Sequence, residues 1–348
     1  MEVEERNAIT VESDGVVNYF CSEGCKNKFL REKVCKVPCT SYDIIIIGGG
    51  PAGLTAAIYA STLKMNALLI TKDLGGQAID STKIENYMGF DFITGPELVE
   101  KFREQLLHAH YIDHLMSDAE KIEPAEEGFN ITTSDLNIYS AQALLIATGM
   151  TRRKLNVPGE EEFQRRGVFY GNIQDLSFVQ GEPVAVLGGG NSALQMVENL
   201  ENIASNIYLV SATKLKADPV IIERVKKIGH LEIYEDFKAD EFSGQGTLSG
   251  ITIRKKGSDE TKTIPVKGAF IAIGFQPNAS LVSDLVDLNE KGEIIIKNDC
   301  STSRSGIFAA GDVTNAFGKR IIIACGEGAK AAMAVRQYIL SVKKEVSL

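Results

Sequence analysis

Two glycine-rich segments are the parts of this sequence whose residue types and spacing are best suited to chemistry. The first, Gly48-Gly49-Gly50-Pro51-Ala52-Gly53, follows four consecutive isoleucines and precedes an Ala- and Leu-rich helix expected from Leu54 to Ser61. In this pattern Gly48 permits a tight turn, Gly50 lets the backbone approach a pyrophosphate, and Gly53 packs the helix against the strand. The phosphates then lie at the helix N-terminus, where unpaired N–H groups favour negative charge. We therefore predict a dinucleotide site rather than a purely structural turn.

The same unit recurs 140 positions later in the chain. A short apolar strand leads into Gly188-Gly189-Gly190-Asn191-Ser192-Ala193, followed by a helix over 194–202 and a second strand from Ile207 to Val210. Each glycine turn starts 23 residues before the residue that ends its second strand, which is Thr71 or Ser211. This internal repeat predicts two nucleotide-binding modules in one chain.

The ends of these second strands leave the choice of nucleotide open. A dinucleotide site usually offers an acidic residue there for the ribose hydroxyls, or an arginine for a 2′-phosphate. Thr71 and Ser211 are neither. Lys214 and Lys216 could pair with a 2′-phosphate, although a solvated loop explains them equally well.

Three shorter motifs become informative beside two dinucleotide sites. Ala147-Thr148-Gly149 ends a buried strand, Gly311-Asp312 ends another, and Gly75-Gly76-Gln77 follows the first module. A carboxylate such as that of Asp312 is costly at the end of an apolar strand unless it accepts hydrogen bonds, for instance from a ribityl hydroxyl. The alternative role is a plain helix N-cap, and we favour the binding role.

The repeated strand–turn–helix–strand unit predicts an α/β fold to position these motifs. Further elements are expected as a hairpin (131–133 with 138–140), a buried strand (143–146), a second hairpin (248–254 with 263–273) and an Ala-rich terminal helix (328–340).

Composition narrows the function classes. A formal net charge of −9 argues against a nucleic-acid-binding protein, which needs a basic face. The longest purely apolar run near the front, Ile44 to Ile47, is far shorter than the about 20 residues that span a bilayer. The acidic start Met1-Glu2-Val3-Glu4-Glu5 does not resemble a secretory signal, so we expect a cytoplasmic protein whose cysteines are not structural disulfides.

Taken in order, these motifs resemble the low-molecular-weight thioredoxin reductase family, and within it most closely the flavoprotein subunit of alkyl hydroperoxide reductase. The resemblance begins at about Tyr42 and also includes Ile84-Glu85-Asn86-Tyr87 and the segment 321–332. It implies a homodimer that reduces a small redox protein or a disulfide acceptor. It also implies two Rossmann-like domains, the second inserted in the first. We therefore expect a Cys-rich module at 1–40, an FAD-binding domain at 41–157 and 275–348, and an NAD(P)-binding domain at 158–274.

The glycine motifs and this resemblance together identify the expected cofactor contacts. For FAD they are Gly48, Gly50, Pro51, Ala52, Gly53, Gly75, Gly76, Gln77, Asn86, Ala147, Thr148, Gly149, Gly311, Asp312, Lys319, Arg320 and Ile321. For NADH or NADPH they are Gly188, Gly190, Asn191, Ser192, Ala193 and Gly274.

The chain departs from the family at the active-site dithiol. The family carries a redox-active Cys-x-x-Cys followed by Asp just ahead of the second glycine motif. Here Gly171 and Gln174 stand in place of the cysteines, while Asp175 remains. Neither replacement has a nucleophilic sulfur, so the thiolate–flavin relay cannot run there. The family's 2′-phosphate arginines are also absent after Ser211, and the segment Leu215-Lys216-Ala217-Asp218 resembles the hydroperoxide reductase subunit, which favours NADH.

Four cysteines near the start of the chain offer a substitute for that dithiol or a metal site. Cys21, Cys25, Cys35 and Cys39 have the spacing C-x3-C-x9-C-x3-C, and the segment around the first two resembles TRASH or YHS metal-binding modules, without their usual upstream cysteine. Four thiolates suit Zn²⁺ or another soft metal, which could fold a segment with little core. A relocated dithiol and ordinary thiols are the alternatives.

A further cysteine, Cys325, stands at the start of the helix that the resemblance places beside the flavin. It is either a thiol activated by the helix N-terminus or simply a small buried residue. We therefore expect an FAD-dependent NAD(P)H oxidoreductase of thioredoxin reductase type that lacks the usual dithiol. The alternatives are a ferredoxin or flavin reductase, and a redox or metal sensor with little turnover.

Overall fold

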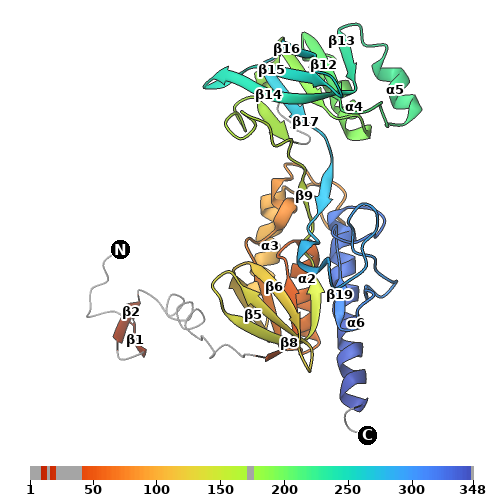
Figure 1. Cartoon of the computed structure of the whole chain (residues 1–348). Coiled ribbons are helices and arrows are strands. Elements are labelled where there is room, and N and C mark those ends of the chain that lie inside the picture. The colour runs from red at the N-terminus through yellow and green to blue at the C-terminus, as the bar shows by residue number, and fades with distance from the viewer. Residues whose placement is uncertain (1–8, 14–15, 21–40, 171–175, 346–348) are drawn as a thin grey trace.

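A computed structural model describes residues 9–13, 16–20, 41–170 and 176–345 of the chain, and its side chains from residue 41 to 342 within those ranges. Two α/β units dominate the described part, each built on its own parallel sheet (Figure 1). The predicted α/β fold class with two nucleotide-binding units is confirmed. Near the start of the chain, β1 (Ile9–Ser13) and β2 (Val16–Phe20) form a separate antiparallel pair.

The larger sheet has seven strands and draws on distant parts of the chain. Its path runs β5-β4-β3-β8-β7-β6, and β19 pairs with β8 in parallel. The strands are β3 (Ser41–Ile47), β4 (Ala67–Thr71), β5 (Ile112–Met116), β6 (Ala119–Pro124), β7 (Phe129–Thr133), β8 (Ile138–Ile146) and β19 (Ile307–Ala309). Because β19 follows β8 by some 160 residues, segments from both sides of the second unit build this sheet.

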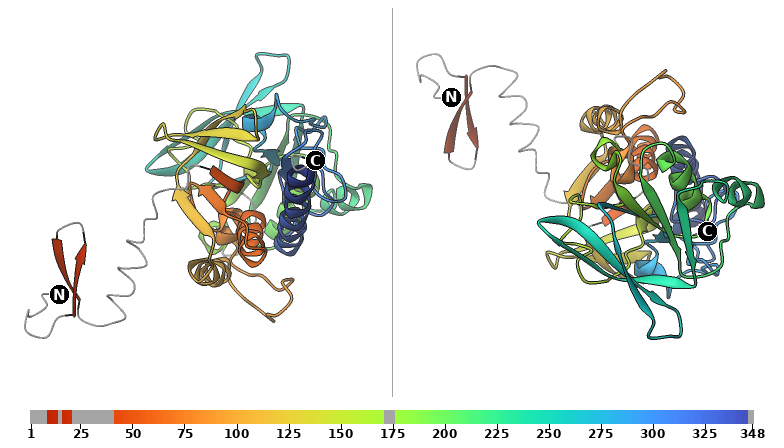
Figure 2. Two further views of the ribbon diagram at one scale, coloured as in Figure 1. Left: turned by 90° about the horizontal axis from the view of Figure 1, so that it is seen from below. Right: turned by 90° about the horizontal axis from the view of Figure 1, so that it is seen from above.

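The isoleucines of β3 are buried on both faces of the sheet, as their unbroken apolar run predicts. Ile44 and Ile46 pack with α2 (Pro51–Thr62) and α6 (Ile321–Glu345), whereas Ile45 and Ile47 pack with the β6–β8 side. The two helices lie alongside each other (Figure 2). They approach so closely that a Cβ at Gly328 would lie 2.1 Å from the carbonyl oxygen of Ala52.

The second unit is a five-stranded parallel sheet covered on both faces. Its order is β10-β17-β11-β12-β13, with α4 and α5 on one face and a three-stranded antiparallel sheet, β14-β15-β16, on the other. The strands are β10 (Val168–Tyr170), β11 (Pro183–Leu187), β12 (Asn206–Ser211), β13 (Leu231–Glu235), β14 (Phe237–Gln245), β15 (Thr247–Lys255), β16 (Thr261–Pro265) and β17 (Gly268–Ile271). The helices are α4 (Asn191–Leu200) and α5 (Pro219–Val225).

Two short antiparallel strands, β9 (Met150–Arg152) and β18 (Phe275–Pro277), lie where the chain passes between the units (Figure 1). The predicted domain boundaries at 157 and 274 fall near them and stay a prediction. The remaining elements are α3 (Gly95–Leu107) and three short 3-10 helices, η2 (Gly76–Asp80), η3 (Ser177–Val179) and η4 (Ser280–Val282). No helix in the described ranges is long and apolar enough to cross a membrane.

Most predicted elements are confirmed, and two need correction. The hairpin of 131–133 with 138–140 is present, and its second strand continues through 146 as β8. The predicted strand 263–273 is wrong, because β16 ends at Pro265, which has no N–H to continue the ladder, and 268–271 joins the other sheet as β17. The terminal helix begins at Ile321, seven residues earlier than predicted, since Gly328 contributes a close helix contact instead of a helix start.

Candidate functional site

The first glycine turn connects β3 to α2 and leaves open space at the helix N-terminus. Gly48 has a φ of +114°, and a Cβ there would lie 2.3 Å from the carbonyl oxygen of Ala147. A Cβ at Gly53 would lie 1.9 Å from the carbonyl oxygen of Gly48. At Gly50, by contrast, a Cβ would meet nothing within 4 Å. The turn therefore needs two glycines for its own packing, and the third faces a space suited to a phosphate.

Segments that are distant in sequence meet at this turn. The N–H of Gly75 donates to the carbonyl oxygen of Gly49 at 2.8 Å, and a Cβ at Gly76 would lie 3.2 Å from the Cα of Gly50. Gln77 is exposed, and its Nε2 donates to the carbonyl oxygen of Met150 at 2.6 Å. The predicted motif of residues 75–77 thus lies against the glycine turn.

The end of β8 is the next wall of this site. Thr148 Oγ1 donates to the carbonyl oxygen of Asn278 at 2.7 Å, and Asn278 Nδ2 donates back to the carbonyl oxygen of Thr148 at 2.8 Å. Gly149 has a φ of +65°, and no atom lies within 4 Å of where its Cβ would be. The pair of hydrogen bonds fixes an open backbone segment beside the glycine turn.

Asp312 follows β19 with a partly buried carboxylate. Burial raises its pKa, while the charges of Lys319 and Arg320 oppose that rise. In the described part of the chain its carboxylate accepts no hydrogen bond, so an acceptor is left for a ligand hydroxyl. Asp312 is not the N-cap of α6, which begins nine residues later. These observations fit FAD, whose pyrophosphate suits the glycine turn and whose ribityl hydroxyls suit the carboxylate.

Two further groups hold this part of the site and were not identified from sequence. Glu327 in α6 is buried, burial raises its pKa, and its Oε2 accepts from the N–H of Gly311 at 2.7 Å. Glu293 lies 3.2 Å from Lys319 Nζ, which also donates to the carbonyl oxygen of Asp312 at 3.2 Å. An acid within the apolar run that opens α6 was the available signal for Glu327. Lys319, a predicted FAD contact, therefore holds the Asp312 backbone.

Cys325 and Tyr87 are brought together by α6 and the loop before α3. Cys325 is buried, and its Sγ lies 3.7 Å from the hydroxyl of Tyr87. Burial is the main cause that raises the pKa of Tyr87 above its usual range, and the neighbouring Cys325 thiol raises it further. The neighbouring predicted contacts Asn86 and Arg320 are exposed.

The second glycine turn, between β11 and α4, repeats the geometry of the first. Gly188 has a φ of +143°, and its Cβ would lie 2.3 Å from the carbonyl oxygen of Ala272, whereas a Cβ at Gly190 would meet nothing within 4 Å. Asn191 exchanges hydrogen bonds of 2.9 and 2.8 Å with Asp218, which fixes the helix start against α5. Gly274 also opens onto free space. This turn has the features expected for a second pyrophosphate.

The end of β12 carries no acid beside this turn. Ser211 is buried, and its Oγ donates to the carbonyl oxygen of Thr213 at 2.7 Å. Lys214 forms ion pairs with Glu235 at 3.0 Å and Asp236 at 3.2 Å. Of the two lysines considered from sequence, Lys214 is thus already paired, and Lys216 is exposed.

The predicted metal ligands Cys21, Cys25, Cys35 and Cys39 lie outside the described residues, as do Gly171, Gln174 and Asp175. Among the residues that are described, no group of three or more His, Cys, Asp or Glu side chains is arranged to hold a metal ion.

Comparison with known proteins agrees with this geometry. Residues 42–337 match the family model described as pyridine nucleotide-disulphide oxidoreductase. An alkyl hydroperoxide reductase subunit of Staphylococcus aureus is 36% identical over 306 residues, covering 86% of this chain and 59% of that protein, so the chain spans about three-fifths of such relatives. Thioredoxin reductases of Lactococcus lactis (33% identity, TM-score 0.68) and Streptococcus pyogenes (33%, 0.66) match 86% and 87% of the chain and 99% of their own lengths.

The family match covers most of the chain, and the related solved structures share its two-unit architecture. The chain therefore belongs to the pyridine nucleotide-disulphide oxidoreductase family and has a thioredoxin reductase-like fold.

Proposed function

We propose that this chain is an FAD-dependent oxidoreductase that passes reducing equivalents from NADH or NADPH to a small redox protein or a disulfide. The observation that carries the proposal is the pair of open glycine turns, at Gly50 and Gly190, each at the N-terminus of a helix. FAD supplies the two-electron chemistry when bound, while the protein supplies binding, orientation and electrostatics.

The residues of the first unit would hold FAD by complementary means. The open turn at Gly50 would receive the pyrophosphate at the N-terminus of α2, and the free carboxylate of Asp312 would accept hydrogen bonds from ribityl hydroxyls. Glu327 would keep the Gly311 turn in place behind it. The proposed FAD-binding domain is 41–157 with 275–348, and the pairing of β19 with β8 supports this division.

Two observations support a class of electron acceptor, namely the names of the relatives and one departure of this sequence from the family. The relatives are named for alkyl hydroperoxide and for thioredoxin reduction, which points to a small redox protein as partner. Since Gly171 and Gln174 stand at the family's dithiol, electrons would leave through the N-terminal cysteines or directly to the partner. Zn²⁺ bound by those cysteines is the competing role, and a homodimer is proposed from the same family resemblance.

An anaerobic titration of the purified yellow protein with NADH and, separately, NADPH tests the proposal. We expect either nucleotide to bleach the flavin band. If dithionite bleaches it and neither nucleotide does, the proposal is wrong. Uptake beyond the two electrons of the flavin would support the cysteine route, and replacement of Cys21, Cys25, Cys35 and Cys39 by Ser should then remove that excess without affecting flavin bleaching.

The lost dithiol also favours a second candidate, a ferredoxin or flavin reductase, because such an enzyme needs no active-site disulfide. Rapid reduction of a one-electron acceptor, unchanged in the four-cysteine variant, would support this candidate over disulfide reduction.

A further inference from the structure

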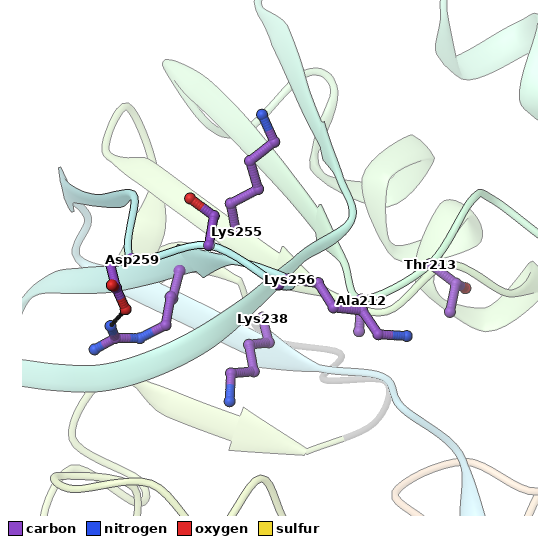
Figure 3. Close-up of a pocket in the computed structure, with 9 residues that line it drawn as sticks. Ala212, Thr213, Lys238, Lys255, Lys256 and Asp259 are labelled. Carbon is purple, nitrogen blue, oxygen red and sulfur yellow. Dashed lines mark ion pairs between the residues drawn. The ribbon is translucent and has the colours of Figure 1, made fainter.

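A cationic cavity of about 590 Å³ lies beside the end of β12 (Figure 3). Its walls are Ala212 and Thr213 on one side and the strand ends and turn of the β14–β16 sheet on the other. Four cations, Lys238, Arg254, Lys255 and Lys256, line it, and Asp259 is its one carboxylate. A space with this balance of charge is suited to an anion.

Two of these four cations, Lys238 and Lys256, are available to bind an anion. Arg254 is held by Asp240 through its Nε at 3.0 Å and also lies 4.0 Å from Asp259, and Lys255 lies 3.4 Å from Glu260. In the described part of the chain, Lys238 and Lys256 have no ion-pair partner. Both side chains are exposed, and although the charge of Lys238 also helps to lower the pKa of Asp240, neither lysine is held in an ion pair within the described ranges.

The cavity is fixed at the edge of the sheet where the second nucleotide site lies. The N–H of Lys256 donates to the carbonyl oxygen of Asp236 at 2.7 Å, directly after β13, the neighbour of β12. Figure 3 shows the Lys256 side chain extending toward Ala212. On the other side of β12's end, a Cβ at Gly189 would lie 2.3 Å from Ser211 Oγ. Ser211 thus connects the glycine turn to the cavity.

The cavity lies where the 2′-position of the adenosine ribose is expected. In a dinucleotide site, the residue that ends the second strand faces the adenosine ribose, and an acid there binds its 2′-hydroxyl. Here that residue is Ser211, and Ala212 and Thr213 follow it, so the ribose meets no carboxylate from this segment. Glu235, the last residue of β13, and the following Asp236 both form ion pairs with Lys214.

We propose that Lys256, assisted by Lys238, binds the 2′-phosphate of NADPH and makes NADPH the preferred nucleotide. This inference rests on the proposed function of the second glycine turn. It opposes the preference for NADH that the segment 215–218 suggests. Lysine serves here as a point charge for phosphate, delivered from the β14–β16 sheet instead of the loop after β12.

Binding of 2′,5′-ADP and of 5′-ADP to the full flavoprotein, measured by isothermal titration calorimetry, tests the inference without electron transfer. We expect 2′,5′-ADP to bind at least about tenfold more tightly, and Lys256→Gln to remove most of that preference. Lys255→Gln is the matched control, since Lys255 is on the same turn, is paired with Glu260, and extends away from Lys238 in Figure 3.

Equal affinity for the two ligands would overturn the inference. So would a preference for 2′,5′-ADP that survives both Lys256→Gln and Lys238→Gln. Because neither measurement requires flavin reduction, a protein that binds 2′,5′-ADP selectively yet oxidises neither nucleotide would refute the proposed function and leave this site standing. The preference should also weaken as salt rises, since exposed charges are screened.

Discussion

The two glycine turns make the same close backbone contact. Gly48 lies against the carbonyl oxygen of Ala147, and Gly188 lies against that of Ala272. A Cβ added to either glycine would lie 2.3 Å from the oxygen. The surroundings differ. The first turn is enclosed by segments from the far end of the chain, including the buried Glu327, whereas the end of β12 opens onto exposed lysines. In the function that we propose, the shared turn would position a pyrophosphate and the surroundings would decide which dinucleotide is bound.

The likeness extends to the residues at the usual position of the ribose-binding acid. Thr71 Oγ1 donates to the carbonyl oxygen of Asp73, and Ser211 Oγ donates to that of Thr213, each two residues ahead. The middle glycine of each turn packs directly against that hydroxyl, since a Cβ at Gly49 or Gly189 would lie 2.4 or 2.3 Å from it. Both hydroxyls therefore stabilise the turn itself, and we propose that other residues recognise the ribose.

The largest expected effect comes from the last of the three positions at which the turns differ in sequence. The third small residue is Gly53 in the first turn and Ala193 in the second. A Cβ at Gly53 would lie 1.9 Å from a backbone oxygen, so Gly53→Ala must displace α2, at a cost of about 1–3 kcal/mol or more. We expect this variant to purify without flavin, as judged from its visible spectrum.

Ala193→Gly is the matched control, because the second turn already accommodates a methyl group at this position. It should retain full flavin content. A yellow Gly53→Ala protein with stoichiometric FAD would show that the two turns tolerate the same side chain, which would contradict the comparison.

The next effect concerns the enclosed carboxylate of the first unit. Asp312→Asn keeps the shape and removes the charge, so a charge-assisted hydrogen bond worth about 1.5–3 kcal/mol is replaced by a neutral one worth about 0.5–1.5 kcal/mol. We expect FAD to bind about tenfold more weakly in equilibrium dialysis of the flavin-depleted protein, with 2′,5′-ADP binding unchanged. Asp259→Asn, an exposed carboxylate of the second unit, should leave FAD affinity unchanged. Equal FAD affinity in Asp312→Asn and the wild type would remove Asp312 from the site.

The pH dependence of the free energy of unfolding is expected to differ between variants of the two units. Burial raises the pKa of Glu327 above its ordinary value of 4.5, so the folded flavin-free protein binds this proton more tightly than the unfolded chain does. The stability from that proton is present below about pH 4.5 and is lost as the pH rises through the raised pKa. Glu327→Gln removes this titration while its amide oxygen still accepts from Gly311.

Urea unfolding of the flavin-free protein at several pH values measures the effect. The free energy of unfolding of the wild type should fall relative to that of Glu327→Gln as the pH rises from about 4.5 to 7. Lys256→Gln, in the exposed second region, should follow the wild-type profile. Parallel profiles for wild type and Glu327→Gln would mean that the buried carboxylate has no raised pKa.

Structural features that depend on neighbouring residues could be predicted from the sequence, whereas features that depend on contacts between distant segments could not. Glycine spacing and the run from Ile44 to Ile47 are local signals, and both turns and the buried strand β3 are present as expected. The contact of Glu327 with Gly311 joins a helix to a strand end, and no periodicity encodes it. Likewise, residues 268–271 read as the end of a hairpin because their parallel partner, β11, is some 80 residues earlier.

The cationic cavity was missed for the same reason. Lys256 is adjacent to Ala212 only because the β14–β16 sheet packs on the face of the five-stranded sheet and its turn is bonded to Asp236. Lysines close in sequence to Ser211 were the only ones that spacing could suggest, and Lys214 proves to be paired with acids.

The smallest effect tests whether the two strand-end hydroxyls are structural. Thr71→Val and Ser211→Ala each remove one hydrogen bond to a carbonyl two residues ahead, so each should lower the free energy of unfolding by about 1 kcal/mol in urea. If both hydroxyls act only within their turns, FAD affinity in the first variant and 2′,5′-ADP affinity in the second should change by less than about twofold. A larger loss of ligand affinity than of stability in Ser211→Ala would place Ser211 on the ribose, and recognition at the second site would then be shared between β12 and Lys256.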